Sequence, residues 1–202
     1  MAGEIRPLKE KLKNGVEGIS ARQLSEHHDV LYAGYVKKLA EIETKLSNAD
    51  LSEANATYSF FGELKREQSF CTNAVTLHEL YFDSLGGDGK PTGNIVDMIA
   101  RDFGSIEKWA AEFSAAGVAA RGWVVLGFNW NDGKLHNYSL DIHTQGIWGA
   151  SPILVLDVYE HAYFLDYGTA RKKYIEAFMK NIDWAVMNKR AEMGEIYEWE
   201  KM

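Results

Sequence analysis

The sequence predicts a chain of class α + α/β, in which two long helices precede a C-terminal part with a three-stranded antiparallel sheet flanked by helices. Three observations lead to this prediction. Apolar residues recur at helical spacing from about residue 20 to residue 85. A Gly-rich cluster at 86–91 then ends the pattern. Short strand-like runs follow, and Asp-Gly between the first two is a strong hairpin signal.

The first long helix is predicted from Ser20 to about Leu46. Ser20 and Gln23, three residues apart, form a capping-box pattern in front of an apolar run. The second helical region is predicted over 52–85, with an interruption near Gly62. The two helices together form the N-terminal part of the chain.

The cluster at 86–91 indicates a boundary between an N-terminal domain, 1–90, and a C-terminal domain, 91–202. The second domain contains, in order, helices at 94–103 and 105–116, strands at 123–130, 135–140 and 152–158, and helical spacing from 162 to about 190. No internal repeat is visible. This order of elements gives the fold class stated above.

The composition indicates a folded globular protein and argues against several other classes. Apolar residues make up 46% and charged residues 25% of the 202 residues, which is typical of a folded globular chain. No apolar run is long enough to span a membrane, and the N-terminus does not read as a secretory signal. The formal charge of −7 argues against nucleic-acid binding. Cys71 is the single cysteine, which favours a cytoplasmic protein.

The histidines are the residues most informative about chemistry. Six occur in the chain, and a hydrogen-bonded core or surface histidine is the simplest interpretation of any one of them. His28 and His136 receive that interpretation. The segment DVYEHAY changes it for His161, because Asp157 ends a wholly apolar strand and His161 follows four residues later. That pair suits a metal site or an acid–base pair, although a structural ion pair fits equally well.

At DVYEHAY the chain resembles the iron/manganese superoxide dismutase family, whose signature is D-x-W-E-H-A-Y. The family's ligand histidine with a tyrosine eight residues later is similar to His27 and Tyr35. The stretch NAVTLHELYF resembles the second-helix motif when it is anchored on His78, with the asparagine closer to the histidine than usual. Further positions that match the family are Gly122, Trp123, Arg171, Tyr174 and Trp184.

The resemblance implies an N-terminal helical hairpin and one Fe or Mn ion per subunit. Its ligands would be His27, His78, Asp157 and His161, a donor set that suits either metal. It also implies superoxide as the substrate. The metal would cycle between +3 and +2, converting two superoxide to oxygen and hydrogen peroxide, with protons delivered through a metal-bound solvent.

Other residues acquire roles through the same resemblance. The family uses a glutamine beside the metal solvent, but Ala74 occupies one of its two positions. His143 falls at the other, as in a subgroup of the family, and is expected to link the solvent to Tyr35. Gln145 is the alternative, and an exposed loop histidine is the simpler interpretation. Tyr35 would guard the metal and pass protons, and Arg171 would attract superoxide.

The resemblance also identifies a contact between subunits and an apolar wall around the metal. Glu160 would pair with the ligand histidine of the opposite subunit, so a homodimer or homotetramer is expected. Leu31 and Phe164 replace a histidine and a tyrosine that hydrogen-bond across that contact in the family. Because both partners are lost, the contact is expected to remain intact. The apolar wall around the metal would consist of Phe82, Trp123 and Tyr159.

Iron is favoured over manganese, because His143 is typical of an iron-rich subgroup and Val155 is closer in shape to the threonine common in iron enzymes. Use of either metal stays open. Two other functions remain as alternatives. One is a non-catalytic relative that keeps the metal, for which the Leu31 and Phe164 changes are the support. The other is a mononuclear metal hydrolase or oxygenase that uses His, His and Asp.

Overall fold

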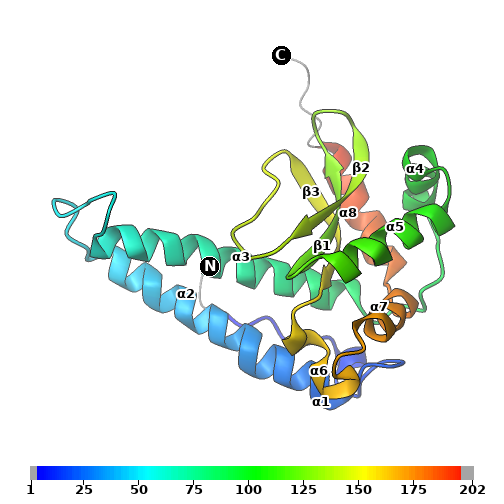
Figure 1. The fold of residues 1–202 in the computed structure, drawn as a ribbon, viewed down its shortest axis with the longest axis horizontal. Coiled ribbons are helices and arrows are strands. Elements are labelled where there is room, and N and C mark those ends of the chain that lie inside the picture. The colour runs from blue at the N-terminus through cyan, green and yellow to red at the C-terminus, as the bar shows by residue number, and fades with distance from the viewer. Residues whose placement is uncertain (1–3, 197–202) are drawn as a thin grey trace.

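The structure is a computed structural model that describes residues 4–196 (Figure 1). A helical hairpin extends away from a body that contains the sheet and the remaining helices. The first arm is continuous through α1 (Ala21–Ser25), the π-helical segment η2 (Glu26–Tyr32) and α2 (Ala33–Leu46). The second arm is α3 (Phe60–Ser84), which packs along α2. The predicted helical hairpin is therefore confirmed.

The predicted start of the second helix, at residue 52, is wrong. Residues 47–59 form turns, in which the side chains of Asp50 and Asn55 accept backbone N–H groups. The helix begins only after Ser59, whose hydroxyl accepts the N–H of Gly62 at 3.0 Å. Gly62 thus lies in the first turn of α3 and interrupts nothing.

Before the hairpin, the chain forms one short turn, η1 (Glu10–Leu12). After the hairpin, the C-terminal part of the chain forms the body of the molecule. Beyond the linker, α4 (Asn94–Phe103) and α5 (Ile106–Ala119) lead to β1 (Trp123–Asn129), β2 (Lys134–Leu140) and β3 (Ala150–Asp157). The chain continues through η3 (Glu160–Ala162), α6 (Phe164–Tyr167), α7 (Arg171–Lys180) and α8 (Trp184–Ile196). The helical spacing expected over 162–190 is broken into these four pieces, of which α6 ends at Gly168, with φ +52°.

The sheet is antiparallel, as expected from the sequence, and its strand order is β2-β1-β3. The register pairs Trp123, the first residue of β1, with Asp157, the last residue of β3. Helices α3 and α8 both pack against β3. The end of β3 that carries Asp157 therefore faces α3, and a strand-end carboxylate comes to lie beside a helix side chain.

One large buried cluster joins the base of the hairpin to the sheet and to α8. A second, small cluster of Leu39, Ile42, Leu64 and Cys71 fills the space between α2 and α3. Arg190 of α8 crosses into the main packing region, where it donates to the carbonyls of Leu80 and Ile153. The base of the hairpin is thus fixed by extensive packing, whereas the rest of its length depends on a few side chains.

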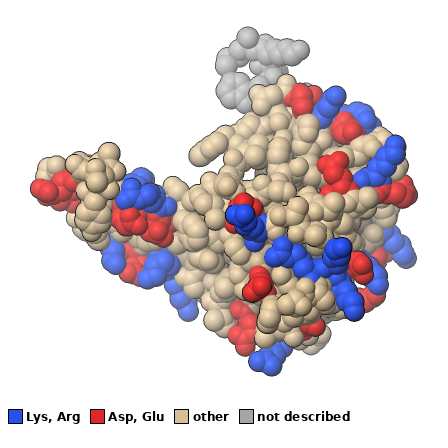
Figure 2. Space-filling view, viewed as in Figure 1, with Lys and Arg blue, Asp and Glu red and all other residues tan. Residues whose placement is uncertain are grey.

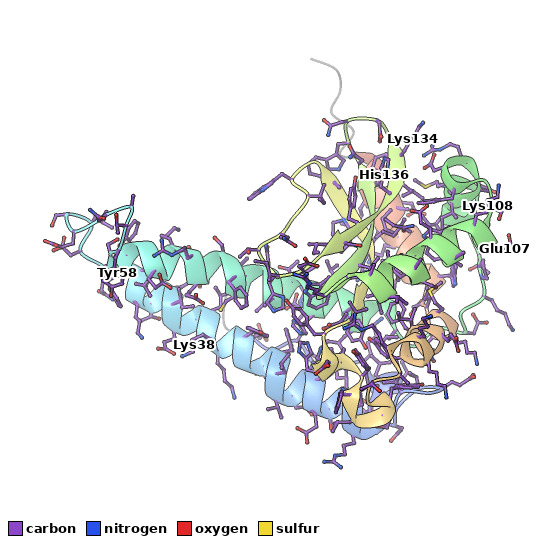
Figure 3. The ribbon with its side chains drawn as sticks, in the orientation of Figure 1. Lys38, Tyr58, Glu107, Lys108, Lys134 and His136 are labelled. Atoms are coloured by element: carbon purple, nitrogen blue, oxygen red, sulfur yellow. The ribbon has the colours of Figure 1, made fainter. Side chains whose placement is uncertain are left out.

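The surface carries both signs of charge, interspersed over the hairpin and the body (Figure 2). Within residues 4–196, no helix is long and apolar enough to cross a membrane. Tyr58 marks the far tip of the hairpin, and His136 lies on β2 (Figure 3).

Candidate metal centre

Four side chains from four elements meet at the base of the hairpin. His27 comes from η2, His78 from α3, Asp157 from the end of β3 and His161 from η3. One donor atom of each lies within 4.8 Å of the others. The side chains of the first three are 0% exposed, and that of His161 is 25% exposed. The structure thus brings together the four residues that the resemblance assigns to the metal.

The distances suit a single ion. Asp157 Oδ2 lies 3.1 Å from His27 Nε2, 3.1 Å from His161 Nε2 and 3.6 Å from His78 Nε2. Two ligands at right angles on one ion, each bonded at about 2.1 Å, are about 3 Å apart. The carboxylate oxygen therefore lies at a ligand-to-ligand distance from all three imidazoles.

Buried donor atoms without a protein partner point to the same ion. Both ring nitrogens of His27 and Nε2 of His78 are buried and make no hydrogen bond. His78 donates its Nδ1–H to the carbonyl of Ala74 at 2.6 Å, which leaves a lone pair on Nε2. Buried polar atoms normally have partners, so the Nε2 atoms of His27 and His78 are explained if a cation takes their lone pairs, while Nδ1 of the neutral His27 ring carries the hydrogen. The residues fit an Fe or Mn ion.

The protonation states also suit metal binding. Burial lowers the pKa of His78 to about 3 and lowers that of His27, so both imidazoles are neutral near pH 7. Burial alone would raise the pKa of Asp157, but the charge and hydrogen bond of His161, together with the nearby imidazole of His27, hold it well below its usual range. His27 and His78 are therefore neutral and Asp157 is ionised, which are the forms in which these side chains bind a metal.

His143 lies between Trp123 and Tyr35. The indole N–H of Trp123 donates to His143 Nδ1 at 2.9 Å, and His143 Nε2 lies 3.2 Å from Tyr35 Oη. Burial lowers the pKa of His143 to about 4, so the ring is neutral near pH 7. Because Nδ1 accepts, the hydrogen of the neutral ring is on Nε2 and is donated to Tyr35. The structure places His143 next to Tyr35, and the simpler interpretation of an exposed loop histidine is wrong because the side chain is 2% exposed.

Aromatic rings surround the four candidate ligands. The ring centroid of Phe82 is 5.0 Å from that of His27, and the Trp123 ring is 5.0 Å from His78. Tyr159 stacks on His161 at 5.1 Å. Its hydroxyl donates to the carbonyl of Asp141 at 3.1 Å, which fixes the ring. The three residues predicted to form an apolar wall are thus brought together at the site.

Other predicted site residues lie further out. Arg171 donates through Nε to the hydroxyl of Tyr163 at 3.0 Å and through Nη1 to the carbonyl of Ala120 at 2.8 Å. Glu160 is exposed. Gln145 is exposed and accepts the N–H of Asp141, so its side chain is engaged in its own loop.

Residues near the expected subunit contact are also at the surface. Phe164 is 47% exposed and Val30 is 64% exposed, and Leu31 is partly buried. Tyr32, three residues before Tyr35, makes its hydrogen bonds elsewhere. Its hydroxyl donates to Glu79 at 2.9 Å and accepts the N–H of Arg6. Of these two tyrosines, Tyr35 alone hydrogen-bonds His143.

Two supports of the site received no role from sequence analysis, although Tyr174 was matched to the family. Asn73 donates to the carbonyl of His143 at 2.7 Å, and the displaced asparagine of NAVTLHELYF was the signal that could have found it. Tyr174 donates its hydroxyl hydrogen to the carbonyl of Asp157 at 2.8 Å, so the adjacent Tyr81, 3.1 Å away, donates to Tyr174. Nothing local in the sequence predicts that this buried pair reaches the strand end.

Comparison with known proteins decides the family. Residues 91–190 match the family model described as iron/manganese superoxide dismutases, C-terminal domain. The superoxide dismutase [Fe] of Aquifex aeolicus is 42% identical over 195 residues, which cover 94% of this chain and 92% of that protein. The chain belongs to the iron/manganese superoxide dismutase family. It is an enzyme of that type, and the alternative of a metal hydrolase or oxygenase is set aside.

Other relatives of this dismutase carry the names of both metals. The superoxide dismutase [Fe] of Aquifex pyrophilus is 44% identical over 191 residues, covering 91% of this chain and 90% of that protein. The superoxide dismutase [Mn] 1 of Halobacterium salinarum is 38% identical over 181 residues, covering 87% and 88% of the two chains. An iron or manganese ion is therefore the cofactor class of the dismutase.

Proposed function

We propose that His27, His78, Asp157 and His161 hold one iron or manganese ion, at which two superoxide are converted to oxygen and hydrogen peroxide. One observation carries this proposal. His27 and His78 have buried nitrogens without protein partners, and these nitrogens lie next to the carboxylate of Asp157. When bound, the ion supplies one-electron chemistry by cycling between +3 and +2, and the peroxide product requires two protons.

Tyr35 would supply a proton at its hydroxyl. Because His143 donates Nε2–H to Tyr35 Oη, the hydrogen of Tyr35 is free to point elsewhere. Burial raises the pKa of Tyr35, so this hydrogen stays on the oxygen near neutral pH. Trp123 holds His143 in the required tautomer. The proposed link from His143 to solvent at the ion would share the same Nε2–H, because Nδ1 already accepts from Trp123.

The surrounding residues would exclude water and guide the anion. Phe82, Trp123 and Tyr159 enclose the candidate ligands, which strengthens electrostatic interactions inside. In a chain with net charge −7, superoxide needs a local positive charge, and Arg171 is the proposed source. Its hydrogen bonds to Tyr163 and Ala120 hold the guanidinium in place.

The identity of the metal and the assembly complete the proposal. Iron is the favoured ion because of His143 and Val155, and the protein is proposed to be cytoplasmic. Glu160 and Phe164 are exposed, which is compatible with a homodimer or homotetramer in which Glu160 reaches the ligand histidine of the opposite subunit.

Reconstitution tests the metal centre. We expect the purified protein to bind one Fe or Mn per subunit and to remove superoxide with at least one of them, whereas the chelated protein is inactive. The measurements are metal content by elemental analysis and superoxide removal before and after loading. Full occupancy with either metal and no activity would contradict the proposal.

His143 has a separate test. His143→Ala removes the hydrogen bond to Tyr35, and we expect activity to fall by about 10-fold or more and the reduction potential of the bound ion to shift. The matched control is His136→Ala, because His136 lies on β2, where it pairs with Asp132 and contacts the Tyr138 ring, away from the candidate ligands. Unchanged activity and potential in His143→Ala would refute the role.

A further inference from the structure

Gln23 makes an unusual pair of hydrogen bonds to the segment that carries His161. The side chain is 1% exposed. Its Nε2–H donates to the carbonyl of His161 at 2.6 Å, and its Oε1 accepts the N–H of Leu165 at 3.1 Å. Sequence analysis expected Gln23 to complete a capping box with Ser20. Only half of that box forms, with Gln23 N–H on the Ser20 hydroxyl at 3.0 Å, because the carboxamide is used elsewhere.

The two groups that Gln23 joins are four residues apart. A continuous α-helix would connect the Leu165 N–H directly to the His161 carbonyl. Here the chain passes from η3 to α6 at this point, and the carboxamide lies between the two groups and satisfies both. The turn that follows the candidate ligand His161 is therefore closed by a side chain from another element.

The helical arm that contains Gln23 also carries a candidate ligand. Gln23 lies four residues, about one helical turn, before His27. Further hydrogen bonds join the two segments, from Ser20 N–H to Asp166 Oδ2 at 2.7 Å and from the Tyr167 hydroxyl to the carbonyl of Gly18. In Figure 1, α6 lies beside α1. Gln23 is the link among these that reaches the backbone of a candidate ligand.

His161 is also the candidate ligand with the least surrounding protein. Its side chain is 25% exposed, whereas those of the other three are 0% exposed. Within one chain, packing therefore restrains His161 less than the others, and its direction depends more on its backbone. A buried neutral carboxamide that holds this backbone restrains the imidazole without adding charge to the site.

We propose that Gln23 is a positioning residue for the metal site: its carboxamide holds the His161 backbone against the helix that carries His27 and thereby slows loss of the ion. The inference rests on the proposed metal centre and adds to it a residue outside the four ligands. It predicts that metal retention depends on the two hydrogen-bonding ends of this one side chain.

The test compares Gln23→Met with Asn188→Leu in metal-loaded protein. Both variants replace a carboxamide with an apolar side chain of similar size. Asn188 makes the same kind of bridge, donating to the carbonyl of Thr92 at 2.7 Å and accepting the N–H of Ile95 at 3.0 Å, but it touches no candidate ligand. The measurements are metal release to excess EDTA at a temperature where each variant is folded, and hydrogen exchange of the Leu165 amide.

We expect Gln23→Met to release metal about 10-fold faster than the wild type, with faster exchange at Leu165, and Asn188→Leu to release it within about twofold of the wild type. Equal release rates for Gln23→Met and the wild type would overturn the proposal. So would equal acceleration by Asn188→Leu, since release would then report general stability. A wild-type protein that takes up no ion would overturn the metal centre itself, which separates the two failures.

Gln23→Glu keeps the proposal testable if Gln23→Met does not fold. Glutamate retains an acceptor for the Leu165 N–H but removes the donor to the His161 carbonyl. We expect metal release faster than in the wild type, with the Leu165 amide still protected. Wild-type release from this variant would overturn the role of the His161 contact.

Discussion

Asp157→Asn should give a folded protein that no longer retains iron or manganese and has lost almost all superoxide dismutase activity. Asp157 supplies the only carboxylate among the four candidate ligands, and its Oδ2 lies within 3.6 Å of all three imidazole Nε2 atoms. Asparagine has nearly the same shape but no charge. Since the site is buried, the missing charge is poorly replaced by solvent.

The expected loss is large. Replacement of residues that only support ligands commonly costs about 10–100-fold in metal affinity, so loss of an anionic ligand should cost more than about 100-fold. The measurements are metal content after dialysis and superoxide removal per subunit. The fold should persist, because an asparagine oxygen can still accept the N–H of Tyr159, as Asp157 Oδ1 does at 2.9 Å.

Asp132→Asn is the control for the change in charge. Asp132 pairs with His136 at the exposed β-hairpin, and its replacement should leave metal content and activity unchanged. If Asp157→Asn bound metal with wild-type affinity, Asp157 would not be a ligand. If the two variants lost metal equally, overall charge and not the buried carboxylate would control binding.

Arg190→Met should produce the largest loss of stability among the changes considered. The Arg190 side chain is 12% exposed and donates to the Ile153 carbonyl at 3.0 Å, the Leu80 carbonyl at 3.2 Å and the Ser84 hydroxyl at 3.1 Å. Methionine can fill the space of the aliphatic stem but can donate to none of them. Each buried acceptor left without a donor costs about 1–3 kcal/mol.

We therefore expect the free energy of unfolding to fall by about 3 kcal/mol, equivalent to a decrease in Tm of roughly 6–12 °C for a chain of this size. Urea unfolding and thermal melts of the same metal-loaded preparation measure the two quantities. Arg66→Met is the control, because Arg66 pairs with Glu63 while 53% exposed and should cost less than about 1 kcal/mol. Equal stability of the two variants would contradict the buried role of Arg190.

Some elements could be predicted because their signals are local. Ser105 caps α5, Gly104 ends α4 with φ +87°, and the Asp-Gly turn joins β1 to β2. The start of α3 was missed because Asp50 and Asn55 side chains stabilise turns within a stretch of helical spacing. The π-helical segment η2 was not predicted, because such segments are rare and nothing in the sequence of 26–32 distinguishes it from an α-helix.

The candidate ligands and Gln23 also show that sequence analysis finds only the residues that have a local signal. His27, His78, Asp157 and His161 could be chosen because their residue types and motifs match a family. Gln23 could not, because its partners lie 138 and 142 residues away and the local pattern predicted a different partner, Ser20. The division into domains 1–90 and 91–202 stays a prediction, and one buried cluster includes residues from both sides of it.

The distribution of the candidate ligands along the chain has a consequence for biosynthesis. The helical hairpin carries two of them, His27 and His78, whereas Asp157 is the last residue of β3 and His161 follows it. A nascent chain that has exposed only its hairpin therefore lacks the anionic ligand. We expect the ion to be captured after β3 has paired with β1, so that the cell must keep iron or manganese available to a finished fold and not to the emerging polypeptide.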